Sequence, residues 1–414
     1  LFGIPGKNPH PLTIPIRLFL PCVMAGRAKL AVTLSVFNRK AAPHVPFEAE
    51  PLVENTPMSN VVIAGYARSP FAQANKGELV RVRPDELAAQ TIKGLLERTK
   101  IDPDAIEDLI LGCAFPEGEQ GLNLGRIVGF LAGLPRTVGG ATVNRFCGSS
   151  MQAAHMAAGA IAMGAGEAFI CAGVESMSRV PIMGFNPMPH PALAKNYPQA
   201  FVSMGETAEN LAAQYKIARG AQDDFAAQSH AKAAAAQAAG KLDAEIVPIV
   251  DGNASVSRDG CIRPGTTRET LAELKPAFLE KGSVTAGTSS PLTDGAAAVL
   301  VCSEDYAKKH KLEPLARIRS IAISGCAPEI MGIGPVHSTQ KALARAGVSL
   351  KDIDVIELNE AFAAQSLAVI QDLKLDPTKI NLDGGAIALG HPLGATGARI
   401  LGKAASLLKR ERGR

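Results

Sequence analysis

Cys147 stands where an apolar, strand-like segment turns into a run of small residues, in the stretch VNRFCGSSMQAA that begins at Val143. The thiolate is the nucleophilic form of cysteine. Its pKa falls at a helix N-terminus, where free N–H groups and the macrodipole favour negative charge. A free cysteine can equally be a small residue of the core. The placement therefore leaves Cys147 as either a nucleophile or a packing residue.

Two further stretches contain polar groups suited to chemistry. His391 lies in a turn within GGAIALGHPLGATGAR, and the surrounding glycines let backbone or ligand come close, which favours a general base over a packing role. Asn359 lies in NEAFA, at the end of an expected strand, where it could orient a water or donate to a developing oxyanion. Glu360 is more simply explained as a helix-start acid without chemistry.

The elements that must position these residues alternate between strand and helix from Asn60 onward. This alternation predicts an α/β fold with a parallel or mixed sheet covered by helices. DAIEDLILGCA, which begins at Asp104, parallels KDIDVIELNEA, which begins at Lys351, and ATVNRFCGSS likewise parallels TKINLDGGA. The two halves thus look like copies of one βαβαβ unit, separated by a proline-rich, partly helical region.

Composition argues against several other classes of protein. The 414 residues carry a net charge of only +4 and 4% aromatic residues without tryptophan, which argues against a nucleic-acid-binding surface. The seven cysteines are odd in number and form no Cys-x-x-Cys motif, so we expect no metal site, no disulfide scaffold and a reducing compartment. We also expect no integral membrane segment, because no apolar run is long enough.

The first 57 residues differ in composition from the rest. Through Phe47 they include lysine and arginine but no acidic residue, which resembles an organelle transit peptide. A disordered extension or a misplaced gene start explains the same composition more simply, and Met58 would then be a sensible start. We therefore expect a cytoplasmic protein, or a mitochondrial one if residues 1–57 form a real transit segment.

Five motifs occur in order: NRFCGSSMQA, MGETAEN, VTAGTSSPLTDGAAA, LNEAFAAQ and GGAIALGHPLGATGAR. Together they resemble the thiolase family from about Ser59 onward, and specifically its degradative 3-ketoacyl-CoA thiolases, the acetyl-CoA acyltransferases of fatty-acid β-oxidation. The resemblance implies duplicated βαβαβ halves in five α-β-α-β-α layers with an inserted loop domain. We expect the N-terminal half at 58–178, the loop domain at 179–285, a return strand at 286–313 and the C-terminal half at 314–414.

The resemblance also implies catalytic roles. Cys147 matches the nucleophile that attacks the 3-keto carbon, releases acetyl-CoA and keeps the shortened acyl group as a thioester until CoA removes it. His391 matches the base that activates Cys147, and with a water held by Asn359 it matches the oxyanion site for the acetyl-CoA enolate. The backbone N–H of Cys147 matches part of a second oxyanion site. Covalent catalysis of this kind splits one difficult transfer into two easier steps.

Coenzyme A is implied as a co-substrate, with no tightly bound cofactor. Arg263, in IRPGTTRETLAELKPAF, matches a family contact to CoA, although solvated surface arginines are common. Ser290 matches a contact to the pantetheine arm. Phe362 matches a residue of the pantetheine tunnel but could equally belong to the core. The resemblance further implies a homodimer or homotetramer, and it is compatible with a partner subunit that has hydratase and dehydrogenase activity.

One departure from the family pattern bears on activity. Thiolases carry a second catalytic cysteine in a Cys-x-Gly motif near their C-terminus, whereas no cysteine follows His391 here, and Cys326 is not in such a motif. The simplest interpretation is that the C-terminal half is incomplete. Two alternatives to the degradative enzyme stay open: a biosynthetic acetoacetyl-CoA thiolase, and a non-catalytic thiolase-like protein that binds acyl-CoA.

Overall fold

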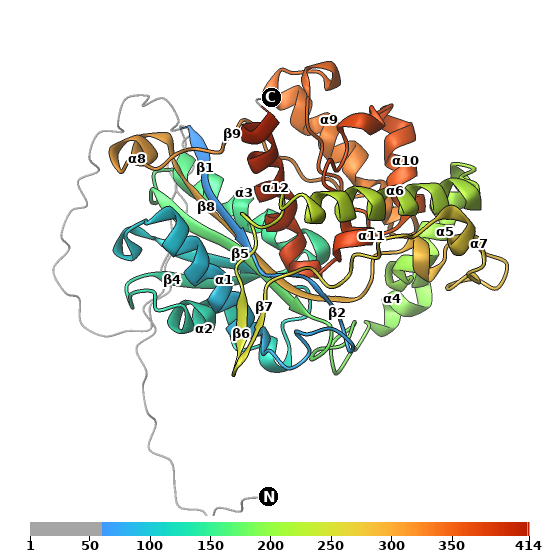
Figure 1. The fold of residues 1–414 in the computed structure, drawn as a ribbon, viewed down its shortest axis with the longest axis horizontal. Coiled ribbons are helices and arrows are strands. Elements are labelled where there is room, and N and C mark those ends of the chain that lie inside the picture. The colour runs from blue at the N-terminus through green and yellow to red at the C-terminus, as the bar shows by residue number, and fades with distance from the viewer. Residues whose placement is uncertain (1–59, 412, 414) are drawn as a thin grey trace, which may run out of the picture. The chain divides into compact units, whose positions relative to one another are not determined.

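A seven-stranded mixed sheet forms the centre of the fold in the computed structural model, which describes residues 60–411 and 413 (Figure 1). Its strands are β1 (Val61–Arg68), β2 (Ala72–Gln73), β3 (Asp108–Gly112), β4 (Gly139–Val143), β5 (Ala168–Ser176), β8 (Thr293–Ser303) and β9 (Ala316–Ile318). The order is β4-β3-β5-β8-β1-β9, with β2 paired to β8. β3 is parallel to β4 and β5, and β8 is antiparallel to β5 and β1. The predicted α/β class is confirmed.

Helices cover both faces of this sheet. α1 (Pro84–Thr99) and α2 (Leu124–Leu131) pack on one face, and α3 (Ser149–Ala162) and α12 (Thr396–Glu411) pack on the other. β1, β5 and β8 are buried along their whole length. This two-sided burial explains why these strands are continuous apolar runs rather than alternating ones.

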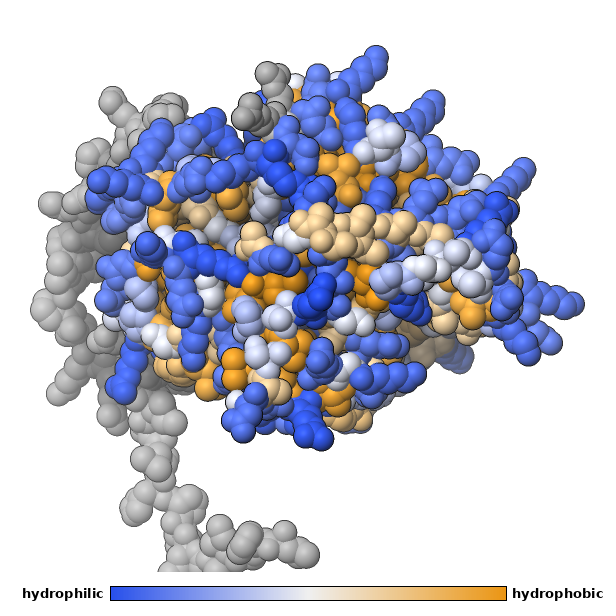
Figure 2. All heavy atoms as spheres, viewed as in Figure 1, coloured by the Kyte–Doolittle hydropathy of each residue, from blue (hydrophilic) through white to orange (hydrophobic). Residues whose placement is uncertain are grey.

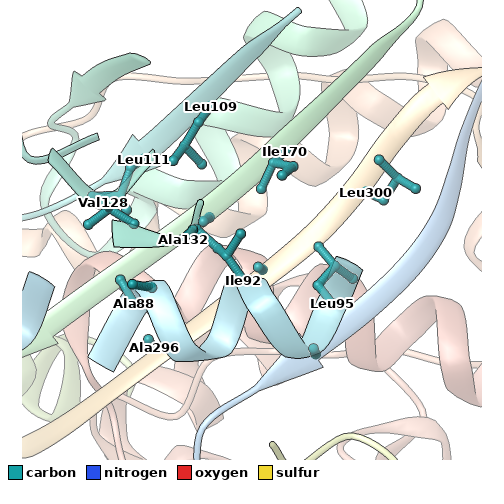
Figure 3. Close-up of a cluster of buried hydrophobic side chains, with 14 of the residues drawn as sticks. Ala88, Ile92, Leu95, Leu109, Leu111, Val128, Ala132, Ile170, Ala296 and Leu300 are labelled. Atoms are coloured by element: carbon teal, nitrogen blue, oxygen red, sulfur yellow. The ribbon is translucent and has the colours of Figure 1, made fainter. Parts of the chain in front are cut away.

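The larger core cluster lies between the sheet and the helices α1 and α2. In Figure 3, Ile92 and Leu95 of α1 face the sheet, where Leu109, Ile170 and Leu300 come from β3, β5 and β8. These residues are far apart in sequence, so the cluster joins segments that only the completed sheet brings together. It makes the sheet a rigid base for the loops at its ends.

The second half of the chain repeats the topology of the first. In the first half a 3-10 helix (Pro103–Ala105) leads into β3, α2 follows, and β3 pairs in parallel with β4. In the second half a 3-10 helix (Leu350–Asp352) leads into residues 355–358, α10 (Ala363–Leu373) follows, and Ile356 forms a parallel bridge with Ile380. The internal repeat predicted from the sequence is therefore a repeat of topology.

The order of the sheet and helix layers follows from this repeat of topology. Figure 1 shows α12 between the central sheet and the helices α9 (Gly334–Ala346) and α10. Within residues 60–411 this pairing is an isolated bridge and not a complete second sheet. Residues 355–358 also line a cavity that β9 lines.

A mostly helical region lies between the two halves. Its elements are α4 (Pro191–Asn196), α5 (Met204–Gln214), α6 (Arg219–Ala238), a hairpin of β6 (Ile249–Asp251) and β7 (Ala254–Val256), and α7 (Arg268–Ala272). α5 and α6 match the helical segments expected there. In Figure 2, alanine-rich α6 appears as a pale stripe on a largely polar face. None of the helices in the described part of the chain could span a membrane.

Candidate active site

Cys147 lies in a 3-10 helix (Phe146–Gly148) that links the end of β4 to the start of α3, the strand-to-helix turn that the sequence predicted. Asn144 fixes this turn: its side-chain oxygen accepts from the Phe146 N–H at 2.8 Å, and its amide donates to the Ala114 carbonyl at 2.9 Å. Phe146 has a left-handed φ of 43°. Such a conformation costs a non-glycine residue free energy and is concentrated at functional turns.

The Cys147 thiol is protonated at neutral pH. Burial raises its pKa to about 12, and the charge of Glu175 adds to the rise. The prediction that the N-terminus of α3 lowers this pKa is therefore wrong. Cys147 is half-buried, and this partial removal of the thiolate from water opposes the helix dipole, whose effect is small and falls off within a turn. Cys147 needs a base that takes its proton as it attacks.

Three hydrogen-bonding partners hold His391. Its backbone N–H donates to Thr293 Oγ1 at 2.9 Å, its Nδ1 lies 2.7 Å from Thr396 Oγ1, and its Nε2 lies 3.4 Å from the Asn359 amide nitrogen. Gly390, just before it, has a φ of 108°, which residues with a Cβ rarely adopt. The glycine is therefore needed to bring the ring to this position.

These contacts leave Nε2 as the basic atom of the His391 ring. The Thr396 hydroxyl donates to the Pro392 carbonyl, so it accepts from Nδ1–H, and the lone pair stays on Nε2. Burial lowers the pKa of His391 to about 3, and the charge of Arg399 contributes. Because the thiol and imidazole pKa values are far apart, the proton moves only together with attack on a substrate, and no resting ion pair forms.

Asn359 is positioned beside His391 by its neighbour Glu360. The buried Glu360 carboxylate accepts from Ser229 Oγ at 2.6 Å, Asn381 Nδ2 at 2.7 Å and the Ile387 N–H at 3.2 Å. The interpretation of Glu360 as a helix-start acid is therefore wrong, because it fastens three other segments from inside the protein. The Asn359 side-chain oxygen is buried without a partner in the described chain, so it can accept from a water or a substrate.

One cavity of about 1970 Å³ joins these groups. Every predicted site residue lines it, namely Cys147, His391, Asn359, Arg263, Ser290 and Phe362. A second region of the same cavity extends between β9 and residues 355–358 and is walled by α9, α10 and α12. Within the part of the chain that the structure describes, no group of three or more His, Cys, Asp or Glu could hold a metal ion.

The three residues that were expected to contact CoA lie at the rim and wall of this cavity. Arg263 is exposed. The N–H and the hydroxyl of Ser290 both donate to the Ala361 carbonyl, at 3.0 and 3.1 Å, which ties its segment to the one that carries Asn359. The Phe362 ring meets Phe278 edge-on, with ring centroids 5.7 Å apart. Phe362 therefore both packs and lines the cavity.

Sequence reasoning missed three residues that hold the site. Thr293 and Thr396 fix the backbone and the ring of His391, and Glu175 is a buried carboxylate at the end of β5. The sequence did indicate Glu175, since it is the single charged residue in the strand AFICAGVES. Nothing in the sequence indicated the two threonines, because a hydroxyl in a glycine-rich run is typical of any turn.

The fold and the site together define a class: a duplicated α/β protein in which a cysteine at a strand-to-helix turn shares a cavity with a neutral histidine. Comparisons with known proteins agree with this class. Family models described as the thiolase N-terminal domain and the thiolase C-terminal domain match residues 61–305 and 312–414. The chain belongs to the thiolase family, as the sequence motifs indicated.

Individual relatives are similar over most of the chain. A 3-ketoacyl-CoA thiolase of Bacillus subtilis is 47% identical, over 83% of this chain and 91% of that protein. Human mitochondrial 3-ketoacyl-CoA thiolase, solved as a crystal structure in complex with CoA, is 38% identical in sequence. The two structures superpose with a TM-score of 0.79, over 86% of this chain and 93% of that one. The crystal structure of an acetyl-CoA acetyltransferase of Bacillus anthracis is 41% identical, with a TM-score of 0.78, over the same shares.

Proposed function

We propose that this protein cleaves 3-ketoacyl-CoA with CoA to acetyl-CoA and an acyl-CoA two carbons shorter, through an acyl thioester on Cys147. The proposal is carried by one observation: Cys147, Asn359 and His391, from three separate parts of the chain, line one cavity. The 47% identical relative from Bacillus subtilis bears the name of this activity, which supports the same reaction. It is a step of fatty-acid β-oxidation.

The first half-reaction forms the thioester. Nε2 of His391 takes the thiol proton while the Cys147 sulfur attacks the 3-keto carbon, and the backbone N–H of Cys147 stabilises the resulting oxyanion. The bond between C2 and C3 then breaks, and its electron pair leaves as the enolate of acetyl-CoA. A water held by Asn359, together with the His391 imidazolium, stabilises that enolate. Return of the proton to C2 completes acetyl-CoA.

The second half-reaction releases the product. The CoA thiol attacks the Cys147 thioester, His391 takes the CoA proton, and the Cys147 thiolate leaves and recovers the proton. Cys147 is the only cysteine among the described residues that line the cavity. In this proposal His391 is the base for both steps.

Coenzyme A is the expected co-substrate, and the proposed contacts are Arg263, Ser290 and Phe362. The Arg263 guanidinium suits a phosphate, because arginine forms paired, charge-assisted hydrogen bonds with phosphate oxygens. Ser290 offers a hydroxyl to the amides of the pantetheine arm, and Phe362 offers an apolar wall. The solved relative that contains CoA supports this assignment of ligand.

Thiolysis of a medium-chain 3-ketoacyl-CoA by the 414-residue chain tests the function. We expect turnover that falls by about a thousandfold or more in Cys147→Ala, because the nucleophile is lost. Without CoA, mass spectrometry should find the acyl group on the Cys147 peptide of the wild type. A folded wild-type protein with neither turnover nor acyl label would instead indicate a protein that only binds acyl-CoA.

A second candidate is the acetoacetyl-CoA reaction, which the likeness to an acetyl-CoA acetyltransferase favours. The two candidates differ in acyl chain length. We expect kcat/KM for longer 3-ketoacyl-CoA substrates to equal or exceed that for acetoacetyl-CoA. Strict preference for the four-carbon substrate would overturn the degradative assignment.

Four further properties are proposed together with the function. They are a homodimer or homotetramer, association with a hydratase and dehydrogenase subunit, a cytoplasmic location, and the domain division into 58–178, 179–285, 286–313 and 314–414. The family resemblance supports the first two and the fourth. The expected leader at residues 1–57 lies outside the described residues. The alternative of a mitochondrial location depends on that leader.

A further inference from the structure

Glu175 is a carboxylate without solvent exposure at the end of β5, in the middle of the central sheet. One of its oxygens accepts from the Ala114 N–H at 2.8 Å and the Gly394 N–H at 2.9 Å. The other accepts from the Phe115 N–H at 3.2 Å and from Gln120 Nε2 at 2.8 Å. A buried carboxylate is costly unless donors compensate it, and here four N–H groups converge on it.

One set of these contacts leads to the catalytic histidine. Gly394 follows His391 by three residues and lies in the 3-10 helix (Leu393–Ala395) that leads into α12. Its backbone also touches β5 directly, since a Cβ added at Gly173 would lie 2.1 Å from the Gly394 carbonyl oxygen. The hydrogen bond from Gly394 to Glu175 therefore fixes the position of the His391 loop relative to β5.

The other set leads to the nucleophile. Ala114 follows β3 and donates to Glu175, and its carbonyl accepts the amide of Asn144. The Asn144 side-chain oxygen accepts the N–H of Phe146, the residue before Cys147. An unbroken chain of hydrogen bonds thus connects Glu175 to the Cys147 turn.

The charge of Glu175 does not by itself favour the reaction. A negative charge near the thiol raises the pKa of Cys147 and so opposes formation of the thiolate. Ala114 and Phe115 line the cavity, but Glu175 is not among the lining residues, so it does not touch substrate. Its contribution to the site is therefore geometric.

We infer that Glu175 is a positioning residue that holds the Cys147 turn and the His391 loop in a fixed position relative to each other. A glutamine at this position would keep the size of the side chain, but it would point N–H groups at N–H donors and break part of the junction. The inference rests on the proposed function where turnover is measured. The reactivity of the Cys147 thiol needs no substrate and can be measured independently.

The test compares Glu175→Gln with Glu209→Gln. Glu209 is a matched control, because it is also buried and accepts the backbone N–H groups of Ser283 and Val284, but it has no hydrogen bond to the Cys147 turn or to the His391 loop. Alkylation of Cys147 by iodoacetamide is followed at pH 8 by mass spectrometry of its peptide. Thiolysis and thermal unfolding are measured on the same preparations.

We expect Glu175→Gln to slow Cys147 alkylation and to lower kcat, each by about tenfold or more, with KM for CoA within about twofold of wild type. Glu209→Gln should lower the unfolding temperature and change neither rate. Slower alkylation cannot arise from charge, since loss of a negative charge would make the thiol more acidic and faster. Alkylation at the wild-type rate or above in folded Glu175→Gln would overturn the inference.

Two other outcomes are decisive. If the wild type shows no thiolysis but Glu175→Gln still slows alkylation, the positioning role stands and the proposed function fails. If Glu175→Gln does not fold, Gln120→Met removes one donor to Glu175 while keeping the length of the side chain. It should slow alkylation in the same direction by a smaller factor, and no change in that variant would contradict the inference.

Discussion

His391 is a base because its surroundings fix one tautomer. Thr396 accepts from Nδ1–H, which leaves the lone pair on Nε2, beside Asn359. Because burial lowers the pKa of His391 to about 3, the ring stays neutral well below its ordinary titration near pH 6.5. The rate of acylation therefore has no acid limb from this residue at physiological pH.

Replacement of Thr396 by valine should expose this dependence on orientation. Thr396→Val keeps the shape of the side chain but removes the hydroxyl, so the His391 ring loses the partner that fixes its tautomer. We expect kcat for thiolysis to fall by about tenfold, which corresponds to one lost hydrogen bond to a buried group. Thr396→Ser keeps the hydroxyl and should retain most of the rate. Equal activity of the two variants would show that the contact does not matter.

The residues of the site differ in how far sequence predicts them. Cys147, His391 and Asn359 were candidates from their local patterns, and the family resemblance implied their roles. Thr396 escaped because a threonine near a helix start is ordinary. Glu175 needed the fold, since its donor Gly394 is 219 positions away and only the completed sheet brings the two together. Sequence also misjudged the Cys147 pKa, because burial cannot be seen in a local pattern.

Two central helices, α3 and α12, approach closely at Gly397, and this contact brings the two catalytic segments together. α3 begins beside Cys147, and α12 begins five residues after His391. A Cβ added at Gly397 of α12 would lie 2.1 Å from the backbone nitrogen of Met151 in α3. The absence of a side chain at Gly397 therefore sets how closely the helices, and with them the reacting groups, can approach.

A pair of identical substitutions tests this contact. Gly397→Ala should push α12 away from α3, lower the unfolding temperature, and reduce kcat by about a hundredfold, since a shift of about 1 Å is enough for such a loss. Gly159→Ala, in α3, has nothing within 4 Å of the added Cβ and should stabilise the protein by about 0.5–1 kcal/mol without loss of activity. Wild-type kcat in Gly397→Ala would refute the close-approach argument.

The elements themselves were largely predictable. The alternation of strand and helix expected from Asn60 onward is present as β1, α1, β3 and α2, and β8 lies within the stretch 286–313 where a return strand was expected. The repeat predicted that residues 355–358 and 380 would pair like β3 and β4, and they do. In the described chain this pairing is an isolated bridge. A strand-like pattern specifies one strand and does not say how many neighbours it meets.

At the scale of the whole molecule, buried charges join the first half, the inserted region and the second half. Arg68 of β1 pairs with Glu245 at 2.8 Å and with Asp259 at 2.7 Å. Lys403 of α12 pairs with the same Glu245 at 3.0 Å and with Asp383 at 2.7 Å. Since each part supplies one or more charges, removal of one leaves its partners buried and undercompensated.

Lys403→Met should therefore lower the free energy of unfolding by about 3 kcal/mol at pH 7. Burial alone would raise the pKa of Glu245 and Asp383, but the cations outweigh it and hold both pKa values below normal. That stabilisation is present above the unfolded carboxyl pKa, near 4, and is lost as pH falls through the folded values. Urea unfolding should therefore show the gap between variant and wild type closing in acid.

A control substitution separates this effect from loss of any lysine. Lys409 forms an exposed pair with Glu313, so Lys409→Met should change the free energy of unfolding by no more than about 0.5 kcal/mol. A gap for Lys403→Met that stays constant from pH 7 to pH 3 would show that the buried pairs are not its cause.

β9 influences how the protein behaves in concentrated solution as well as how it folds. The strand is three residues long, pairs with β1 on one side in the described chain, and lines the cavity along its length. An unpaired strand edge is a template to which another extended chain can add, largely regardless of its sequence. Arg317 of this strand pairs with Glu304 at 2.6 Å, and Arg319 follows the strand directly, so charged side chains accompany this edge. Charged side chains at a strand edge are one means by which proteins disfavour the addition of a further strand.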